Sequence, residues 1–388
     1  MLKIHWFLPT GGDSRDIVPS ADGAPPRPPS LDYLTQVAQA AEILGFDALL
    51  TPCGTGCEDA WVSTAMLISR TSRVKFLVAF RPGLLSPTLA AQMASTYQRL
   101  SGGRLLLNIV VGAEPTELAR FGDFTDKAAR YERTGEFIEI MRGAWDAEPF
   151  DYDGDHYRVV GADTRAALDP TPDIYFGGAS VGAETVAART ADVYLTWGEP
   201  PDMVAERVER MQALAAAEGR TLRLGIRFHA IARPTSAEAW AVADALLAGI
   251  SPEAIAAARA DFAGTQSEGQ RRMAALHAAA ADGTADGSGA EAPATSRDGL
   301  EIYPNLWAGV GLVRGGAGTA LVGSFEEVAD LIGTYADLGF EEFILSGYPH
   351  LEEAWWVGEG VLPLLRERGL VAPLADGTAA AAPVFHFR

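Results

Sequence analysis

The feature that most constrains the fold is a recurring unit in which an amphipathic helix ends at glycine and a strand follows at once. In the first copy, Ser30 is a predicted N-cap, Gly45 a predicted terminator, and residues 46–50 a strand. In the last copy, Ser324 and Glu327 form a predicted capping box ahead of a helix that ends near Gly339. Repetition of helix and strand in this order predicts an α/β fold.

The number and character of the strands narrow this class further. Most are nearly continuous apolar runs, as in parallel strands that are covered on both faces. The predicted strands span residues 2–8, 46–51, 74–80, 104–111, 172–176, 191–196, 222–231 and 342–346. Eight such strands predict a (β/α)₈ TIM barrel in a single domain, residues 1–370. A doubly wound open sheet is the alternative, but residues 9–13 (PTGGD) lack the phosphate fingerprint that it requires.

The connection between the seventh and eighth strands, about residues 232–341, is longer than one crossover helix needs. Residues 278–299 are rich in small and polar residues, so we expect disorder there. Residues 306–323 (LWAGVGLVRGGAGTALVG) combine apolar residues, glycines and Arg314, which predicts a mobile lid with hinges. Residues 371–388 form a predicted flexible tail.

Charge and composition limit the classes of partner. The formal net charge of −20 disfavours nucleic acid and anionic membranes, so small molecules are the expected ligands. No apolar stretch is long enough to cross a bilayer, and residues 1–9 are interpreted as a first strand rather than a leader. The two cysteines, Cys53 and Cys57, suit a reducing compartment, and the predicted location is the cytoplasm.

The active site of such a barrel forms at the carboxyl ends of its strands, and reactive side chains gather there. Arg227 and His229 lie two residues apart on the seventh strand, so they project to the same face and suit an oxyanion. Their alternative role is to satisfy buried carbonyl groups. The other candidates at strand ends are Cys53, Cys57, Arg81, Gly177, Gly178, Ser180, Trp197 and Tyr348.

Each of these candidates also has a structural interpretation. The turn that comprises Gly177, Gly178 and Ser180 could hold a phosphate or be a tight strand-to-helix connection. Trp197 could wall a planar ligand or pack in the core, and Tyr348 could donate a proton or be a core hydroxyl. Cys57 precedes a predicted helix over residues 58–72 whose dipole would lower the pKa of the thiol, unless the residue only fills space.

No metal site is predicted, because the six histidines are scattered and form no ligand cluster. Asp151, Asp153 and Asp155 alternate around Gly154, but the spacing fails the calcium-loop pattern and predicts a hairpin.

Several long motifs resemble one family. They are residues 57–61 (CEDAW), 175–178 (YFGG), 195–201 (LTWGEPP), 304–318 (PNLWAGVGLVRGGAG) and 346–354 (SGYPHLEEA), within a likeness that runs from residues 6–10 to about Leu365. With these motifs the chain resembles the FMNH₂-dependent alkanesulfonate monooxygenases of the bacterial luciferase-like superfamily.

The resemblance implies a two-component flavin-dependent monooxygenase. A separate NAD(P)H-dependent FMN reductase would supply reduced FMN, and O₂ would be used to cleave the C–S bond of an organosulfonate to sulfite and an aldehyde. Arg227, His229, Arg314 and Tyr348 match residues that hold the sulfonate and the flavin peroxide, and Cys57 and Trp197 match other functional positions. The matching flavin contacts are Ala79, Asn108, Tyr131, Gly177, Gly178 and Ser180. The family also implies a homo-oligomer, a dimer or a tetramer.

The chain departs from the family pattern in two places. Gly11 stands where the family usually has histidine, and residues 51–56 (TPCGTG) replace a loop with arginine. Both changes remove polar bulk and indicate a substrate larger than a short alkanesulfonate, so a sugar sulfonate such as sulfoquinovose, a sulfone or a sulfinate stays open. The further alternatives are an oxidoreductase that uses the deazaflavin F420 and a non-catalytic flavin-binding barrel.

Overall fold

Parallel strands close into a barrel in the computed structural model, which describes residues 1–19, 25–283 and 297–374. In this part of the chain the barrel has eight strands, and the pairing of β8 with β9 closes the ring. In barrel order they are β9 (Arg223–Arg233), β13 (Glu342–Ser346), β1 (Lys3–Phe7), β2 (Ala48–Thr51), β3 (Lys75–Phe80), β4 (Leu105–Ile109), β7 (Ile174–Gly177) and β8 (Val193–Trp197). The predicted TIM barrel is therefore confirmed, and each predicted strand overlaps an observed one.

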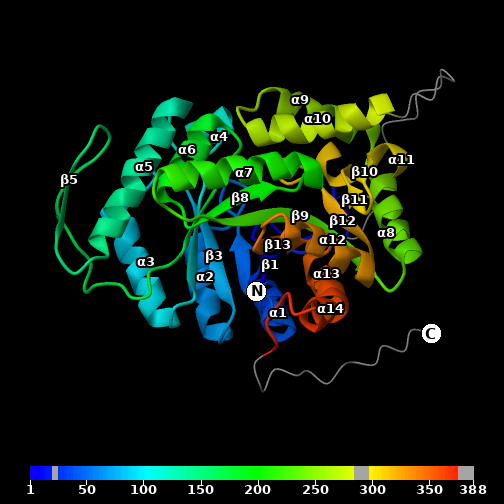
Figure 1. Cartoon of the computed structure of the whole chain (residues 1–388), viewed down its shortest axis with the longest axis horizontal. Helices are drawn as coiled ribbons and strands as arrows, with labels where there is room; N and C mark the ends of the chain where they lie inside the picture. Colours follow the sequence, from blue (N-terminus) through cyan, green and yellow to red (C-terminus); the bar gives the residue numbers. More distant parts are fainter. Residues whose placement is uncertain (20–24, 284–296, 375–388) are drawn as a thin grey trace.

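Helices surround the barrel (Figure 1). The two helix signals from the sequence have the expected geometry. The Ser30 side chain accepts a hydrogen bond from the Tyr33 amide at the start of α1 (Leu31–Leu44), and Gly45 ends that helix with a φ of 85°. Ser324 and Glu327 form the capping box of α12 (Phe325–Asp337). The other helices against the strands are α2 (Ala60–Leu67), α3 (Pro87–Ser101), α5 (Lys127–Ala144), α6 (Val181–Thr190), α7 (Pro201–Ala217), α13 (His350–Trp356) and α14 (Leu362–Glu367).

A layer of apolar side chains crosses the interior of the barrel. They are Phe7, Ala48, Leu50, Leu77, Leu106, Tyr175, Val193 and Ile344, with Leu195 packed against them. On β9 the corresponding residue is Gly225, where a Cβ would lie only 2.5 Å from the Leu195 side chain. Since strand side chains alternate, the residues two positions beyond this layer face the same axis at the carboxyl end of the barrel.

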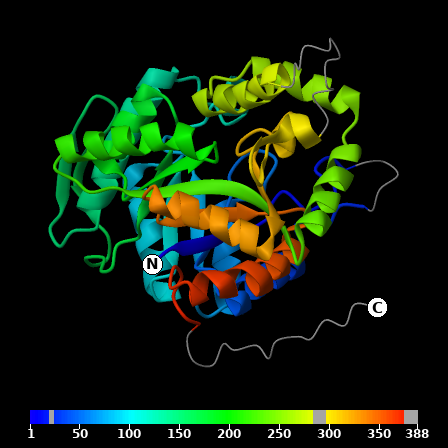
Figure 2. The ribbon, with the colours of Figure 1, turned by 45° about the vertical axis from the view of Figure 1, so that its right-hand side comes forward.

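The insertion after β9 adds helices and a sheet extension. It contains α8 (Ser236–Ala248), α9 (Pro252–Ala263), α10 (Glu268–Gly283), α11 (Arg297–Leu300), β10 (Glu301–Tyr303), β11 (Leu306–Trp307) and β12 (Ala320–Ser324). The carboxyl end of β9 extends beyond the barrel, where it pairs in parallel with β12. Figures 1 and 2 show α9 and α10 lying across the carboxyl end of the barrel, joined to it through α8.

The structure qualifies the expected lid and the expected disorder. Residues 306–323 are largely buried because β11 and β12 extend the sheet, and only the tip at Arg314 and Gly315 is exposed. In the segment 278–299, α10 continues to Gly283 and α11 begins at Arg297, while residues 284–296 lie outside the described residues. Of the predicted tail, Val371 is buried beside Leu2, and residues 375–388 are not described.

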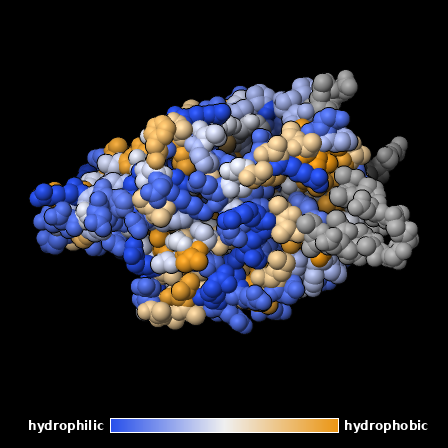
Figure 3. All heavy atoms as spheres, turned by 90° about the horizontal axis from the view of Figure 1, so that it is seen from above, coloured by the Kyte–Doolittle hydropathy of each residue, from blue (hydrophilic) through white to orange (hydrophobic). Residues whose placement is uncertain are grey.

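Three further observations concern the hairpin and the surface. The aspartates at 151, 153 and 155 belong to the hairpin of β5 (Phe150–Asp153) and β6 (Arg158–Ala162), as predicted. The face that carries α7, α9 and α10 is mainly hydrophilic (Figure 3). Among the described residues, no single helix has both the length and the apolar character needed to cross a membrane, and only the bent pair of α8 and α9 taken together meets those criteria.

Candidate functional site

The carboxyl end of the barrel brings together most of the residues singled out from the sequence. Alternation along the strands directs the side chains two positions beyond the apolar layer into this mouth. These residues are Ala79, Asn108, Gly177, Trp197, Arg227 and Ser346. Register supports the grouping, because Ala79 pairs with Asn108, and Arg227 pairs with Trp197.

Arg227 is a cation without an anionic partner in the described part of the chain. Its guanidinium lies 4.8 Å from the centre of the Phe7 ring, which forms the floor of the mouth. Its Nε is buried and has no hydrogen-bond partner. Burial and the neighbouring charge of Arg314 lower the pKa of Arg227 to about 10. A cation held in this way favours an anionic ligand.

His229 is fixed by hydrogen bonds at both ring nitrogens. Nε2 donates to the Ala317 carbonyl at 3.1 Å, and Nδ1 lies 3.0 Å from the Ser346 hydroxyl. A carbonyl can only accept, so Nε2 carries the hydrogen and Nδ1 accepts from Ser346. Burial, reinforced by the positive charge of Arg227 and Arg314, holds the pKa of His229 well below its usual value. His229 is therefore a neutral ring with a single tautomer.

Tyr348 stacks on this ring. The two ring centres lie 5.3 Å apart with planes 19° from parallel, and the Arg314 guanidinium lies 5.9 Å from the Tyr348 ring. The phenol oxygen is buried without a partner among the described residues. Burial raises the pKa of Tyr348, although Arg314 and Arg227 oppose the shift, so the phenol keeps its proton and can donate it in a hydrogen bond.

Arg314 sits at the exposed tip of residues 306–323, and α10 contacts that tip. The Gly316 amide donates to Gln270 Oε1 at 3.0 Å, and His277 Nε2 donates to the Ala308 carbonyl at 2.8 Å. Gln270 and His277 belong to α10, so this helix holds both ends of the segment that presents Arg314 to the mouth.

The same helix is anchored to the barrel rim. Arg272 makes a bidentate pair with Glu199, which is 1% exposed, through Nε at 2.8 Å and Nη2 at 2.5 Å. A Cβ at Gly269 would lie 2.8 Å from the Trp197 ring, so α10 packs directly on this indole. The position of Trp197 thus suits both the wall and the packing role that the sequence left open.

The cysteines correct one expectation. Helix α2 begins at Ala60 with Asp59 as its N-cap, so Cys57 lies before the first turn, and the helix ends at Leu67 rather than near residue 72. Burial raises the pKa of Cys57, against smaller opposing effects of Thr10 and Arg314, and burial raises the pKa of Cys53 to about 11. Both side chains are therefore thiols at neutral pH, and desolvation outweighs the helix dipole.

The structure also corrects the expectation that Gly11 enlarges the substrate pocket. A Cβ there would lie 2.8 Å from the Gly56 carbonyl oxygen and 3.7 Å from Cys57 Sγ. The loop before Cys57 thus closes on Gly11, and the loss of a side chain does not open an equal volume for substrate. This backbone contact weakens the argument for a larger substrate.

Two polar groups at the mouth were not assigned a role from the sequence. Arg81, next in the inward series after Leu77 and Ala79, is 8% exposed and pairs with Glu117 at 2.5 Å, and its Nε and Nη1 have no described partner. Glu117 also accepts from the Thr55 amide at 3.0 Å, so the pair holds the cysteine loop. The position of Arg81 was visible in the sequence, whereas its partner was not.

The second group centres on Asp13. His350 Nδ1 donates to Asp13 Oδ1 at 2.8 Å, its amide also donates to this carboxylate, and the Tyr33 hydroxyl donates as well. Burial opposes ionisation, but the hydrogen bond and charge of His350 prevail and lower the pKa of Asp13. The centre of the His350 ring lies 5.6 Å from the centre of the Tyr348 ring, so the Asp13–His350 pair helps to position Tyr348.

Of the predicted flavin contacts, Ala79, Asn108 and Gly177 belong to the mouth, and Tyr131, Gly178 and Ser180 form a second group at the start of α6. Ser180 caps α6, and its hydroxyl lies 3.1 Å from the Tyr131 hydroxyl. Gly178 has a φ of 142°, and a Cβ there would lie 2.7 Å from Ala183, so the turn requires glycine. Free amides at the start of α6 beside two hydroxyl groups make a cradle for a phosphate. Among the described residues, no cluster of three or more His, Cys, Asp or Glu could hold a metal ion.

Comparison with known proteins defines the class. The model of the luciferase-like monooxygenase family matches residues 2–342, so the chain belongs to this family.

Solved structures agree with the fold. Riboflavin lyase, determined with modified FMN and riboflavin, superposes with a TM-score of 0.75 at 22% identity and covers 96% of this chain and 93% of its own. EDTA monooxygenase from Chelativorans sp. BNC1 gives 0.75 at 20% identity, covering 96% and 95%. The coenzyme F420-dependent tetrahydromethanopterin reductase from Methanopyrus kandleri gives 0.64 at 16%, covering 94% and 99%. The three structures share the fold, and the names of the first and the third give different molecules, FMN and F420, so the fold alone does not decide the cofactor.

Proposed function

We propose that this protein is a two-component monooxygenase that uses reduced FMN and O₂ to cleave the C–S bond of an organosulfonate, releasing sulfite and an aldehyde. The observation that carries the substrate class is Arg227, a partly buried cation whose Nε is buried and which has no anionic partner in the described part of the chain, within the electrostatic influence of Arg314. A sulfonate offers one negative charge and three acceptor oxygens to these donors.

The residues present fit FMN. The start of α6, with Ser180 and Tyr131, suits the terminal phosphate, while Ala79 and Asn108, paired across β3 and β4 at the mouth, would contact the ring. Reduced FMN, when bound, would supply the electrons that activate O₂ for oxygen transfer to the substrate.

The residues of the chain bind, orient and shield the substrate. Arg227 and Arg314 would hold the sulfonate oxygens from opposite sides, and the Tyr348 hydroxyl would donate a hydrogen bond to an oxygen between them. His229 positions Tyr348 by stacking and remains neutral. Helix α10 and the tip at Arg314 would exclude water from the mouth, as oxygen transfer requires.

A panel assay tests the proposal. Photoreduced FMN and O₂ are supplied with linear alkanesulfonates and sulfoquinovose, and sulfite is measured. For a sulfone and a sulfinate the aldehyde is measured instead, because oxygenation of a sulfone leaves a sulfinate rather than sulfite. Sulfite from at least one substrate is expected, with its release lost in Arg227→Met. Binding of reduced FMN without sulfite from any member would refute the substrate assignment.

Direct binding separates the rivals. Titration with reduced FMN and with F420 should show tighter binding of reduced FMN, weakened by Ser180→Ala. Tighter binding of F420 would favour hydride transfer, and tight binding of oxidised FMN with no turnover would favour a storage barrel. An NAD(P)H-dependent FMN reductase in the cytoplasm would be the partner, and a homo-oligomer, a dimer or a tetramer, the functional form.

A further inference from the structure

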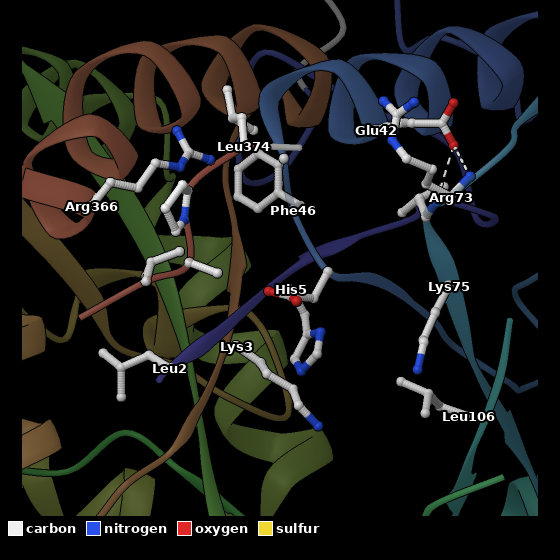
Figure 4. Close-up of a pocket in the computed structure, with 16 residues that line it drawn as sticks. Leu2, Lys3, His5, Glu42, Phe46, Arg73, Lys75, Leu106, Arg366 and Leu374 are labelled. Atoms are coloured by element: carbon white, nitrogen blue, oxygen red, sulfur yellow. Dashed lines mark hydrogen bonds between the residues drawn. The ribbon is translucent and has the colours of Figure 1, made fainter. Parts of the chain in front are cut away.

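A cavity lies at the opposite end of the barrel from the mouth. Its volume is about 280 Å³, and its lining includes Lys3 and Lys75, the first residues of β1 and β3. Strands that run in parallel begin at one end and finish at the other, so this cavity is separated from Arg227 by the apolar layer of the barrel. In Figure 4 His5 lies between Lys3 and Lys75, and Phe46, Arg366 and Leu374 lie together on the side toward the helices.

The charge of the cavity wall is positive although the whole chain is strongly acidic. The lining cations are Lys3, Arg73, Lys75 and Arg366, and the lining acids are Glu42 and Asp47. Main-chain donors occupy both acids: Glu42 accepts from three consecutive amides, those of residues 72–74, and Asp47 accepts from the Ile4 amide at 2.8 Å. Lys3 Nζ pairs with Glu342 Oε1 at 3.4 Å, whereas Lys75 has no ion pair in the described part of the chain.

His5 is a buried polar group that faces this cavity with one nitrogen free. The residue is 0% exposed, and its Nδ1 has no hydrogen-bond partner in the described structure. Its Nε2 lies 3.0 Å from Glu342 Oε2, which the Tyr175 hydroxyl also contacts, while Arg223 Nη1 donates to Glu342 Oε1 at 2.6 Å. Glu342 thus fixes the imidazole through Nε2–H, and an anionic ligand would be bound by the imidazolium form, whose Nδ1–H points to the cavity.

The remaining wall of the cavity is apolar. It is formed by Leu2, Phe46, Val74, Val371 and Leu374. Leu2 and Val371 are bridged to each other, so residues from both ends of the described chain close this side.

We propose that this cavity binds a small organic anion, with its charged group toward Lys3, His5 and Lys75 and a short apolar chain against Phe46 and Leu374. The pattern of cations on one side and apolar side chains on the other matches an aliphatic carboxylate of a few carbons. Such a ligand would bridge β1, β3 and the C-terminal segment, independently of the chemistry at the mouth.

Calorimetric titration of the full chain with hexanoate tests the site, with hexan-1-ol and hexylammonium as probes of equal shape. Hexanoate is expected to bind at least fivefold more tightly than either probe. Lys75→Gln should weaken hexanoate binding at least fivefold, whereas Arg158→Gln, which removes an equal charge from the exposed β5–β6 hairpin, should leave it unchanged.

Arg227→Lys and Arg227→Met separate this cavity from the mouth. We expect both variants to bind hexanoate with unchanged affinity, since neither substitution alters the cavity beside Lys75. Loss of hexanoate binding in Arg227→Met but not in Lys75→Gln would place the anion at the mouth and overturn the proposal. Equal binding of hexanoate and hexan-1-ol would also overturn it, because the cations would then have no role.

Discussion

The imidazole of His229 on β9 donates from Nε2 to the carbonyl of Ala317, at 3.1 Å. Beside the backbone pairing of β9 with β12, this bond is a side-chain link between the fixed strand of the barrel and the segment that carries Arg314. Together with the Ser346 hydroxyl at Nδ1 it decides the tautomer of the ring and places Tyr348 by stacking. The two halves of the proposed anion site are therefore connected before any ligand arrives.

The stability of the protein should fall as the pH drops below the usual pKa of histidine. The pKa of native His229 lies well below 6.5, so between these two values the unfolded chain binds a proton that the native ring does not. Above about pH 6.5 both states are neutral and the contribution is flat. Urea unfolding of wild type and His229→Gln between about pH 5 and 8 should show a shallower acid slope in the variant. Equal slopes would show that His229 protonates normally in the fold.

Arg227→Met should stabilise the protein while it removes activity. The substitution takes away a charge that has no described anionic partner, which we expect to raise the free energy of unfolding by about 1–3 kcal/mol. Sulfite release should fall by at least about 100-fold, since the anion loses its fixed cation. Arg207→Met is the control, because Arg207 is 5% exposed and contacts Glu199 and Thr196, so its loss should destabilise the fold. Destabilisation by Arg227→Met would mean that the cation is satisfied without ligand.

Arg314→Ala should nearly abolish turnover and weaken binding of reduced FMN only modestly. Arg314 is exposed, so thermal stability should stay near that of wild type, while sulfite release falls by about 100-fold or more. Arg271→Ala, which removes an exposed cation of α10 that pairs with Glu268, should retain wild-type rates. Wild-type rates in Arg314→Ala would contradict closure by this segment.

Gly11→Ala and Gly56→Ala are a matched pair. The added Cβ at Gly11 meets the Gly56 carbonyl at 2.8 Å, and we expect a loss of about 1–3 kcal/mol in the free energy of unfolding. At Gly56 a Cβ meets nothing within 4 Å, so the change should stay within about 0.5 kcal/mol. Chemical denaturation measures both, and equal effects would show that the loop does not press on Gly11.

The cysteines should react slowly with iodoacetamide at neutral pH. With a pKa of about 11 for Cys53, the thiolate is scarce, and alkylation at pH 8 should be at least about 50-fold slower than for a cysteine peptide. Mass spectrometry of the digested protein measures each site. Fast alkylation of Cys57 at pH 7 would contradict the raised pKa and support the sequence-based expectation that the dipole of α2 lowers the pKa of this thiol.

The sequence predicted the barrel because its determinants are local. Caps such as Ser30 and Ser324, terminators such as Gly45 and the apolar strands act within a few residues of themselves. The shared face of Arg227 and His229 also follows from strand periodicity alone. The location of the site at the strand ends needed only the rule that governs such barrels.

The tertiary structure decided everything that depends on partners remote in sequence. Contacts between separate elements pair Arg81 with Glu117 and His350 with Asp13. Such contacts also bury Cys57, which keeps it a thiol. The backbone of Gly56 closes against Gly11, which the sequence could not show, because a residue type does not reveal what stands opposite it. The sequence thus determined which side chains point along the barrel axis, and packing alone determined their charge state and the space left between them.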